Sequence, residues 1–255
     1  MDDLIINLKK GEKIFFASDF HLGTPDLYSS IAREKKIVAW LESIKKEAHT
    51  IFLLGDIFDF WFEYRKVVPK GFIRLLGKLA ELSDQGIQII LFTGNHDLWM
   101  RDYLTSEMNV KIFKSEIRMV VGEKSFLIGH GDGLGPGDKM YKLLKKVFVN
   151  PLAQWMFSIL PPVFGMGLAH SWSRKSRVSS NKSGEKFYGE DEFLLQYCNQ
   201  VESQNHHDFY VFGHRHLLLD LKVGARSRYI NLGEWVNNSN YAEFDGVDLH
   251  LRVFV

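Results

Sequence analysis

The first half of the chain alternates short apolar runs with longer runs that are apolar on one face only. Residues 13–17, 50–54 and 87–92 are mostly apolar and have the length of strands. Between them, residues 29–47 and 70–84 place apolar side chains at helical spacing. Because the run at 87–92 is too apolar to have a wet face, we expect a sheet that is covered on both sides. The β-α-β-α-β order predicts parallel strands joined by right-handed crossovers.

The pattern changes after residue 110. Residues 117–121 and 125–128 predict the two strands of a hairpin around a Gly-Glu pair. Several helical patterns fill residues 138–205, and strand signals resume at 208–212 and continue in short runs to the end. We therefore expect an α/β fold in which a mixed β-sandwich is flanked by helices and carries a helical insertion near residues 138–205.

Composition narrows the class of protein. The 255 residues suit one large domain, and the 45% hydrophobic content excludes a disordered chain. Cys198 is the only cysteine, so a disulfide framework is impossible. With 32 Lys and Arg against 31 Asp and Glu, we expect no nucleic-acid partner held by bulk positive charge. Two of the first four residues are acidic, and this terminus lacks a basic, then apolar, signal region, which predicts a cytoplasmic protein.

Polar residues with metal-binding side chains directly follow five of the predicted strands. The five segments are Asp19-Phe20-His21, Gly55-Asp56, Gly94-Asn95-His96-Asp97, Gly129-His130-Gly131-Asp132 and Gly213-His214-Arg215-His216. In open α/β sheets, sites form beyond the carboxyl ends of the strands. The glycines allow sharp turns that bring the side chains toward one centre. We therefore expect one site that is assembled from all five segments.

The residue types constrain the chemistry of this site. Carboxylate, imidazole and amide oxygen, without thiolate, suit a divalent first-row metal such as manganese, iron or zinc. The segments hold too many ligands for one ion, whereas two ions that share a bridging carboxylate would use them all. Two-ion sites of this kind have metals about 3.5–4 Å apart and clamp a phosphoryl group. A lone Asp-x-His pair is more often an ordinary turn, so the prediction depends on the five segments occurring together.

The five segments, with the second one extended to Asp59, resemble the calcineurin-like metallophosphoesterases from residue 13 to about residue 235. The resemblance implies a four-layer α-β-β-α sandwich. It also implies that one metal is held by Asp19, His21, Asp56 and His216, and a second by Asp56, Asn95, His130 and His214. His96 would lie beside the leaving group as a general acid or a transition-state donor, and Asp97 would orient His96.

A narrower resemblance is to the branch of this family that cleaves the diphosphate bond of UDP-2,3-diacylglucosamine in lipid A biosynthesis. It is carried by residues 55–61, by Asp138 and Tyr141 after the fourth segment, and by residues 179–182 and 232–235. The products would be UMP and 2,3-diacylglucosamine 1-phosphate. Well-known members of this branch carry arginine where this chain has His96, which is the commoner residue in the wider family. A related branch with a shifted substrate is therefore an alternative.

Residues 147–173 contain no Asp, Glu, Lys or Arg. Pro151, Pro161 and Pro162 interrupt the stretch, so it cannot form one helix of bilayer length. A pair of buried helices is the ordinary interpretation. The functional interpretation is an apolar cap that binds acyl chains and touches the membrane surface, because burying acyl chains gains about 0.8 kcal/mol per methylene.

A basic run follows the apolar stretch. A single basic run is usually a solvated loop, but its position beside an apolar run favours a ligand with phosphate next to lipid. From this pairing and the narrower resemblance, the candidate substrate-binding residues are Asp138, Arg174, Arg177, Ser180, Asn181 and Lys182.

We therefore predict a dinuclear-metal phosphoesterase that uses two divalent ions, with Mn²⁺ favoured, on a UDP-linked diacylated sugar lipid. We expect it at the cytoplasmic face of the inner membrane as a peripheral protein, with no nucleic acid and no obligate protein partner. Two alternatives stay open. One is a phosphodiesterase or nucleotide pyrophosphatase that acts on a soluble substrate and has a fully buried cap. The other is a non-catalytic binding scaffold, which is disfavoured because no ligand position is missing.

Overall fold

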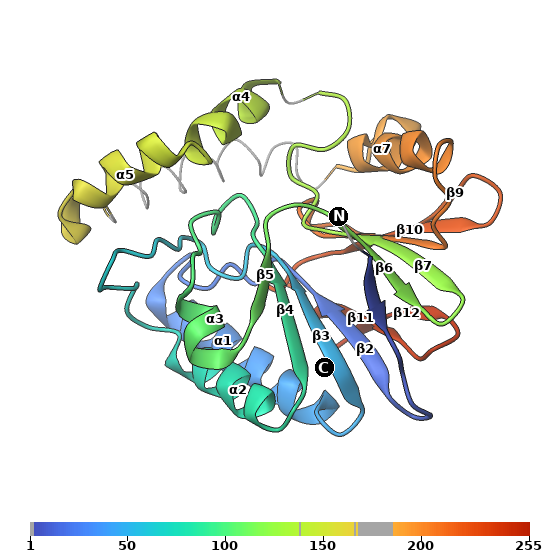
Figure 1. Ribbon diagram of the computed structural model, residues 1–255, viewed down its shortest axis with the longest axis horizontal. Coiled ribbons are helices and arrows are strands. Elements are labelled where there is room, and N and C mark those ends of the chain that lie inside the picture. Colours follow the sequence, from blue (N-terminus) through green and yellow to red (C-terminus); the bar gives the residue numbers. More distant parts are fainter. Residues whose placement is uncertain (1–2, 138, 166, 168–185) are drawn as a thin grey trace.

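The apolar runs of the first half form the centre of a six-stranded sheet in the computed structural model, which describes residues 3–137, 139–165, 167 and 186–255 (Figure 1). Its strands, in spatial order, are β12 (Leu249–Val253), β11 (Asn240–Phe244), β2 (Lys13–Ala17), β3 (Ala48–Leu54), β4 (Gln88–Phe92) and β5 (Lys111–Phe113). Strands β2 to β5 are parallel, and β11 pairs with β2 in the antiparallel sense. The expected parallel arrangement of the first three apolar runs is confirmed.

A second six-stranded sheet packs against the first. Its strands, in spatial order, are β1 (Leu4–Ile6), β6 (Ile117–Val121), β7 (Lys124–Ile128), β8 (Phe209–Phe212), β10 (Ser227–Leu232) and β9 (Leu218–Val223). Strands β6 and β7 form the predicted antiparallel hairpin, while β7 and β8 are parallel. The segments that follow β7 and β8 therefore leave the sheet at the same edge.

Three apolar clusters hold four layers together. Between the sheets, Phe16 of β2 stacks on Phe126 of β7 with ring centroids 6.3 Å apart. A second cluster joins the first sheet to helices α1 (Leu27–Ile44), α2 (Ile73–Asp84) and α3 (Tyr103–Met108). The third joins the second sheet to helix α7 (Phe193–Glu202). This order of helices, sheet, sheet and helix confirms the expected α-β-β-α sandwich.

Local chemistry explains where the helices behind the first sheet begin. Asp26 caps α1, because its Oδ1 accepts a hydrogen bond from Ser29 N at 2.9 Å. The helix expected at 70–84 begins at Ile73, because Gly71 and Phe72 have positive φ angles of 111° and 57°.

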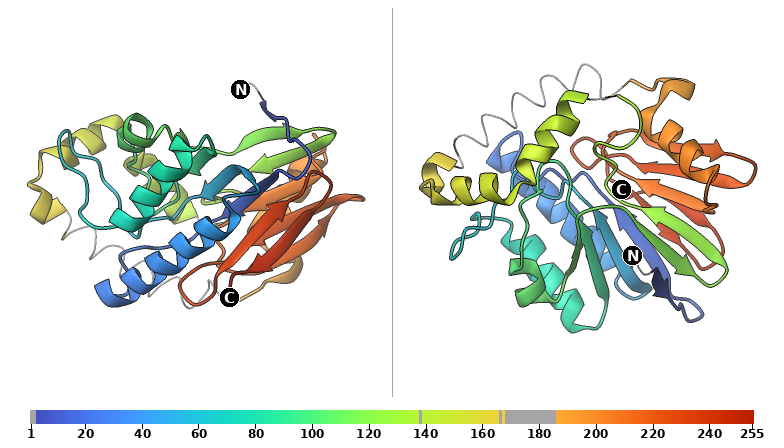
Figure 2. Two further views of the ribbon diagram at one scale, coloured as in Figure 1. Left: turned by 90° about the horizontal axis from the view of Figure 1, so that it is seen from below. Right: turned by 45° about the horizontal axis from the view of Figure 1, so that its top comes forward.

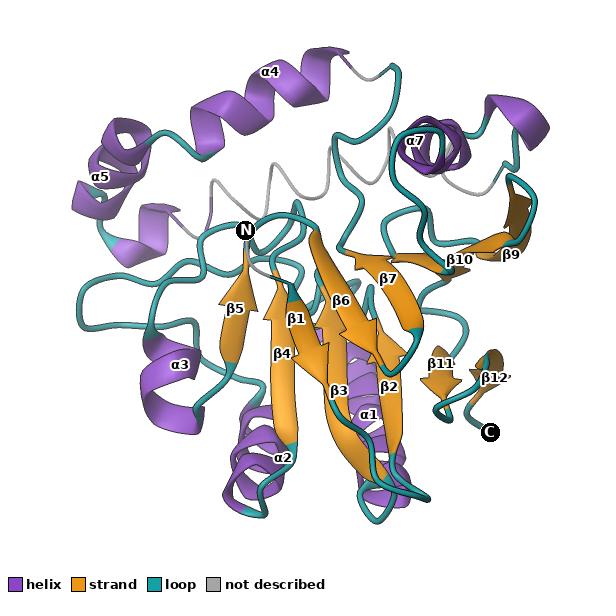
Figure 3. Cartoon of the chain, turned by 45° about the vertical axis from the view of Figure 1, so that its right-hand side comes forward, coloured by secondary structure: helices purple, strands orange, loops and turns teal. Residues whose placement is uncertain are grey.

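The helices α4 (Lys139–Phe148) and α5 (Pro151–Ile159) lie beyond the carboxyl ends of the central strands (Figure 3). Two further views show that they gather at one end of the molecule (Figure 2). Along the described residues of both helices, no side chain is buried. Among the helices of the described ranges, none combines the length and the apolar character that crossing a membrane requires.

The later part of the expected insertion has a different environment. After the short 3₁₀ turn Gly189–Asp191, the chain enters α7, whose Leu194, Leu195 and Cys198 are buried against the second sheet. The sequence pattern assigned this helix to the insertion at 138–205. Helical periodicity alone does not show whether a helix belongs to a cap or covers a sheet. Its apolar face covers the second sheet and belongs to the sandwich.

Candidate metal centre

The predicted ligands all follow strands that end at the same edge. Strand β2 leads to Asp19 and His21, β3 to Asp56, β4 to Asn95, β7 to His130, and β8 to His214 and His216. The φ angle is positive at five of them: Asp19 (55°), His21 (44°), Asp56 (51°), His214 (67°) and His216 (52°). Residues with side chains rarely adopt this region, at a cost of roughly 1–2 kcal/mol each. Such strain is typical of functional loops and persists only where other contacts hold it.

Backbone hydrogen bonds between the loops supply those contacts. Asp19 N donates to Gly55 O at 3.1 Å, and His21 N donates to Asp56 O at 2.9 Å. From the loop after β10, Trp235 N donates to Asp19 O at 3.1 Å. The loops after β2, β3 and β10 therefore fix one another, and the side chains they carry have defined positions.

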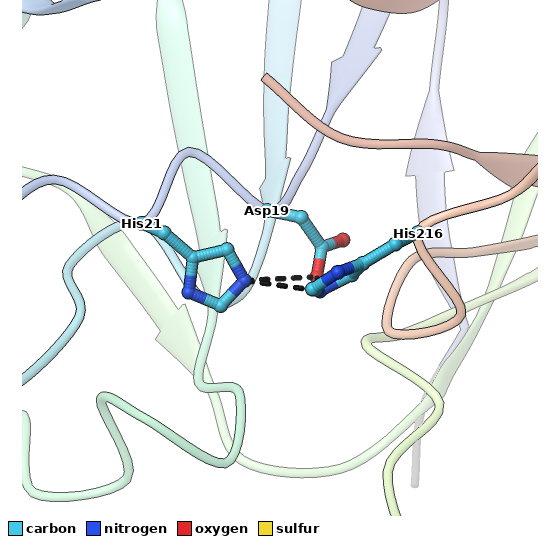
Figure 4. Close-up of side chains that lie close together, drawn as sticks. All are labelled: Asp19, His21 and His216. Atoms are coloured by element: carbon cyan, nitrogen blue, oxygen red, sulfur yellow. Dashed lines mark hydrogen bonds and ion pairs between the residues drawn. The ribbon is translucent and has the colours of Figure 1, made fainter. Parts of the chain in front are cut away.

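Asp19, His21 and His216 form the first donor set (Figure 4). Nε2 of His21 lies 3.1 Å from Nε2 of His216 and 3.7 Å from Oδ1 of Asp19. Nε2 of His216 lies 3.2 Å from the same Asp19 oxygen. Oδ2 of Asp56 is 3.7 Å from Nε2 of His21, so a fourth oxygen borders this set. Two imidazoles and two carboxylates at these separations suit one first-row ion.

Asp56, Asn95, His130 and His214 form the second donor set. Nε2 of His130 lies 3.5 Å from Oδ2 of Asp56 and 3.2 Å from Oδ1 of Asn95. Nδ1 of His214 lies 3.0 Å from the same Asn95 oxygen. Oδ2 of Asp56 is thus the atom that borders both sets. The structure brings all seven predicted ligands together, with one carboxylate between two groups.

The hydrogen bonds around the donor sets leave donor atoms available for divalent cations. Oδ1 of Asp19 is buried, and no described residue donates a hydrogen bond to it, while its Oδ2 accepts from Ser18 Oγ and from His214 N. A buried carboxylate oxygen without a donor is costly unless a cation lies beside it. Nδ1 of His130 lies 2.7 Å from the Leu54 carbonyl, which can only accept, so in the neutral ring the lone pair is on Nε2.

Two glycines allow the donor sets to close. A methyl group at Gly94 would overlap the backbone nitrogen and Oδ1 of Asp56. A methyl group at Gly213 would overlap Ser18 Oγ and Asp19 Oδ2. Glycine at these motif positions therefore lets the backbone of one loop touch the ligand of another.

Burial and charge set the protonation of the metal-free site. Burial opposes the charged form of His130, but attraction from the Asp56 carboxylate outweighs it and raises the pKa of His130 to about 10. Burial, together with the charge of His130, lowers the pKa of His214 to about 4. Burial would raise the pKa of Asp56, yet the surrounding histidines hold it far below its usual range. The Asp56 carboxylate is therefore ionised, and a metal ion that binds His130 would have to displace its proton.

His96 lies at the edge of the first donor set. Its ring is perpendicular to that of His21, with centroids 4.9 Å apart. Its Nδ1 lies 3.0 Å from the Asp59 carbonyl and 3.7 Å from Oδ1 of Asp59. Because a carbonyl only accepts, Nδ1 donates, and Nε2 is the ring atom for exchanging a proton.

The expectation that Asp97 orients His96 is wrong in this structure. Oδ1 of Asp97 accepts from Gly94 N at 2.7 Å, and Oδ2 accepts from Ile57 N at 2.8 Å. Asp97 therefore joins the backbones of the loops after β3 and β4. Burial, with repulsion from Asp56, raises the pKa of Asp97 to about 7. The residue that holds His96 is Asp59, whose only sequence signal was its place three residues after Asp56 in the second segment.

The six candidate substrate-binding residues, Asp138, Arg174, Arg177, Ser180, Asn181 and Lys182, lie outside the described residues. Of the apolar stretch, residues 147–165 are described, and many of their side chains are exposed: Trp155 is 59%, Met156 60% and Phe164 72% exposed. Two buried helices, the ordinary interpretation, are therefore excluded for this part of the stretch.

Comparison with known proteins identifies the family to which the chain belongs. The family model of the calcineurin-like phosphoesterases matches residues 12–218. The chain belongs to this family, and we conclude that it is a metal-dependent hydrolase. The His and Asp clusters accordingly serve divalent metal ions.

Relatives with a more specific name match almost the whole chain. The UDP-2,3-diacylglucosamine hydrolase of Porphyromonas gingivalis is 40% identical over 253 residues, which is 94% of this chain and 97% of that protein. The protein of the same name from Vibrio parahaemolyticus is 25% identical and covers 94% and 98% of the two chains. Among solved structures, the Escherichia coli phosphoesterase Yfce covers 95% of this chain and 100% of its own, with 15% identity and a TM-score of 0.45.

Proposed function

We propose that this protein hydrolyses the diphosphate bond of UDP-2,3-diacylglucosamine, giving UMP and 2,3-diacylglucosamine 1-phosphate in lipid A biosynthesis. Relatives with the corresponding name support this substrate, one of them at 40% identity. The observation that carries the proposal is the combination of two donor sets around Asp56 with exposed apolar helices beyond the same strand ends. The donor sets suit a diphosphate, the helices suit acyl chains, and this substrate contains both.

We further propose that the two donor sets bind two Mn²⁺ ions. Asp19, His21 and His216 would hold one ion, Asn95, His130 and His214 would hold the other, and Asp56 would lie between them. When bound, the ions would neutralise charge on the phosphoryl oxygens and activate water. Mixed imidazole and oxygen donors without thiolate support manganese, although they also suit iron and zinc.

The protein's own residues would have separate parts in the reaction. His96 would protonate the departing oxygen from Nε2, because its Nδ1 is committed to Asp59. Asp59 would keep the ring in that orientation. Asp97 would act only through the backbone, since it fixes the loop that carries Asn95 and His96.

The helices α4 and α5 would receive the acyl chains and contact the membrane. Their exposed apolar side chains include Leu143, Leu152, Trp155, Met156 and Ile159, and α4 has four lysines and no acid. Acyl chains gain about 0.8 kcal/mol per buried methylene, and lysines favour anionic lipid. We therefore propose peripheral association with the cytoplasmic face of the inner membrane.

Contacts to the sugar and the phosphates are assigned, on the sequence alone, to Asp138, Arg174, Arg177, Ser180, Asn181 and Lys182. Their place in the chain supports this assignment. Ser180, Asn181 and Lys182 come shortly before Lys186 in the sequence. The Lys186 carbonyl accepts a hydrogen bond at 3.1 Å from Arg215, which lies between the proposed ligands His214 and His216.

A direct assay tests the substrate. Purified protein is stripped of metal, reloaded with Mn²⁺, Fe²⁺ or Zn²⁺, and given UDP-2,3-diacylglucosamine in detergent, with UMP measured as product. We expect UMP release that needs added metal and is strongest with manganese. The same preparations are given bis(p-nitrophenyl) phosphate. Turnover of this soluble diester without UMP release would overturn the lipid substrate and leave the metal site standing.

A further inference from the structure

The start of the insertion contacts a loop that carries a proposed metal ligand. Asp132 lies two residues after His130 and is 5% exposed. Its Oδ2 accepts a hydrogen bond from the Tyr141 hydroxyl and lies 2.7 Å from Nζ of Lys145. Lys145 also donates to the Asp132 carbonyl at 3.0 Å. Because both partners are on α4, this helix is tied to the His130 loop.

The chain that returns from the insertion makes a similar contact. Arg215 lies between His214 and His216, and its Nε donates to the carboxylate of Glu192, at the beginning of α7. Its Nη2 donates to Glu192 Oε2 at 3.2 Å and to the Lys186 carbonyl at 3.1 Å. Glu192 is 0% exposed. Residues 186–192 are therefore fastened to the loop that carries two proposed ligands.

These two contacts are costly to break. Both join opposite charges around a buried carboxylate, and removing one partner of such a pair is strongly unfavourable. Other described contacts of α4 and α5 join uncharged partners or a backbone carbonyl. The Trp99 indole donates to the Phe148 carbonyl at 2.8 Å, and Phe157 packs against Phe62 and Trp99.

We propose that Asp132 and Arg215 are positioning residues through which the insertion and the metal ligands stabilise one another. This inference rests on the metal sites of the proposed function, in which His130, His214 and His216 are ligands. A ligand loop that contacts the insertion would be held closer to its metal-bound geometry than a loop without that contact. Its affinity for metal would therefore be higher. By thermodynamic reciprocity, metal binding then stabilises the insertion by the same factor.

Manganese titration of metal-free protein by calorimetry tests the contact at Arg215. Arg215→Lys keeps the charge and removes the fork that holds Glu192. We expect the dissociation constant of Mn²⁺ to rise about tenfold, as for other residues that orient metal ligands. Arg228→Lys is the matched control. Arg228 is also ion-paired, with Asp220 and Asp248, but it is the partner of Phe209 at the opposite end of the sheet. Its Mn²⁺ affinity should be unchanged.

Lys145→Met tests the same idea from α4, without changing a residue of the metal loops. We expect the dissociation constant of Mn²⁺ to rise about fivefold, at the lower end of typical coupling between sites. Lys146→Met changes an exposed neighbour that forms no ion pair with any described residue, and it should bind Mn²⁺ like the unaltered protein. This pair keeps the test informative if Arg215→Lys does not fold.

Amide hydrogen exchange gives the reciprocal measurement. Adding Mn²⁺ to the unaltered protein should slow exchange in residues 139–148 and 186–192, and this slowing should shrink in Lys145→Met and Arg215→Lys. Manganese binding that leaves exchange unchanged there, or wild-type affinity in both variants, would overturn the proposal. Neither measurement uses a substrate, so failure to cleave the lipid would overturn the proposed function alone.

Discussion

The metal-ligand loops and the helices α4 and α5 differ in packing although they serve one proposed reaction. In the loops, Asp19, Asp56 and His130 are 0%, 1% and 3% exposed, and hydrogen bonds from neighbouring loops fix their backbones. In α4 and α5, no described side chain is buried. Small displacements impair metal binding and phosphoryl transfer, so the residues that perform them lie on constrained backbone. Recognition of acyl chains is non-directional and tolerates loosely supported helices.

This contrast leads to a rule that experiments can test. Changes in the loops should impair turnover of every substrate, because they alter the metals or the reacting phosphoryl group. Changes on α4 and α5 should impair only substrates with acyl chains. The soluble diester bis(p-nitrophenyl) phosphate separates the two kinds of effect.

The largest effect is expected for Asp56→Ala. The substitution removes the oxygen that borders both donor sets, so metal binding and turnover of both substrates should fall on the order of 10³-fold. The measurements are kcat/KM for both substrates and metal content by mass spectrometry. Asp220→Ala, an exposed acid paired with Arg228, is the control and should retain activity. Turnover by Asp56→Ala near the unaltered rate would refute the bridging role.

The next effect in size is expected for Gly94→Ala. Its Cβ would lie 2.2 Å from Oδ1 and 2.5 Å from the backbone nitrogen of Asp56, so Asp56 has to shift by roughly 1 Å, and misplacement on this scale costs on the order of 10²-fold in kcat/KM. Gly77→Ala is the control, because no described atom lies within 4 Å of its Cβ position in α2. That control should retain activity and gain about 0.5–1 kcal/mol of stability. Equal behaviour of the two variants would contradict the close approach at Gly94.

A smaller effect is expected from pH. The raised pKa values of His130, about 10, and of His216 mean that protons compete with metal, whereas His214, with a pKa near 4, is already neutral. Metal affinity should therefore increase with pH, on the order of tenfold per unit between about pH 6 and 8 for each proton displaced. Calorimetric Mn²⁺ titrations across this range measure the slope. A flat profile would mean that His130 is neutral in the metal-free protein.

The smallest effect on chemistry is expected for the double variant Trp155→Ala and Met156→Ala. Losing this exposed apolar surface should raise KM for the lipid about tenfold, since roughly 1–2 kcal/mol of burial is lost. Turnover of the soluble diester and the Tm should not change. Ile5→Ala removes an exposed apolar side chain on β1 and should leave both substrates unaffected. A matching loss on the soluble diester would break the division between loops and helices.

Much of this architecture could be predicted from periodicity and from the order of motifs. The run at 87–92 had no polar face, and its strand is indeed covered by the second sheet on one side and by helices on the other. Ligand-type residues directly after strands predicted convergence at one edge, because parallel strands end together. The four layers and the division of ligands between two metals came from the resemblance to a known family.

Side-chain direction could not be predicted from sequence proximity. Asp97 follows His96 directly, yet its carboxylate turns back to the amides of Gly94 and Ile57, while Asp59 from another loop meets the His96 ring. The positive φ angles of the ligands were also unpredictable, because they depend on hydrogen bonds from loops distant in sequence. The exposure of many side chains in residues 147–165 depends on tertiary packing. Their apolar composition alone was equally consistent with buried helices and with an exposed cap.

The left-handed backbone at five proposed ligands also affects how readily this protein could lose its chemistry. At such positions glycine relieves the strain, so a change such as Asp19→Gly or His216→Gly removes a ligand and part of a conformational cost together. The strain that glycine relieves therefore offsets part of the stability that is lost with the hydrogen bonds and packing of the ligand side chain.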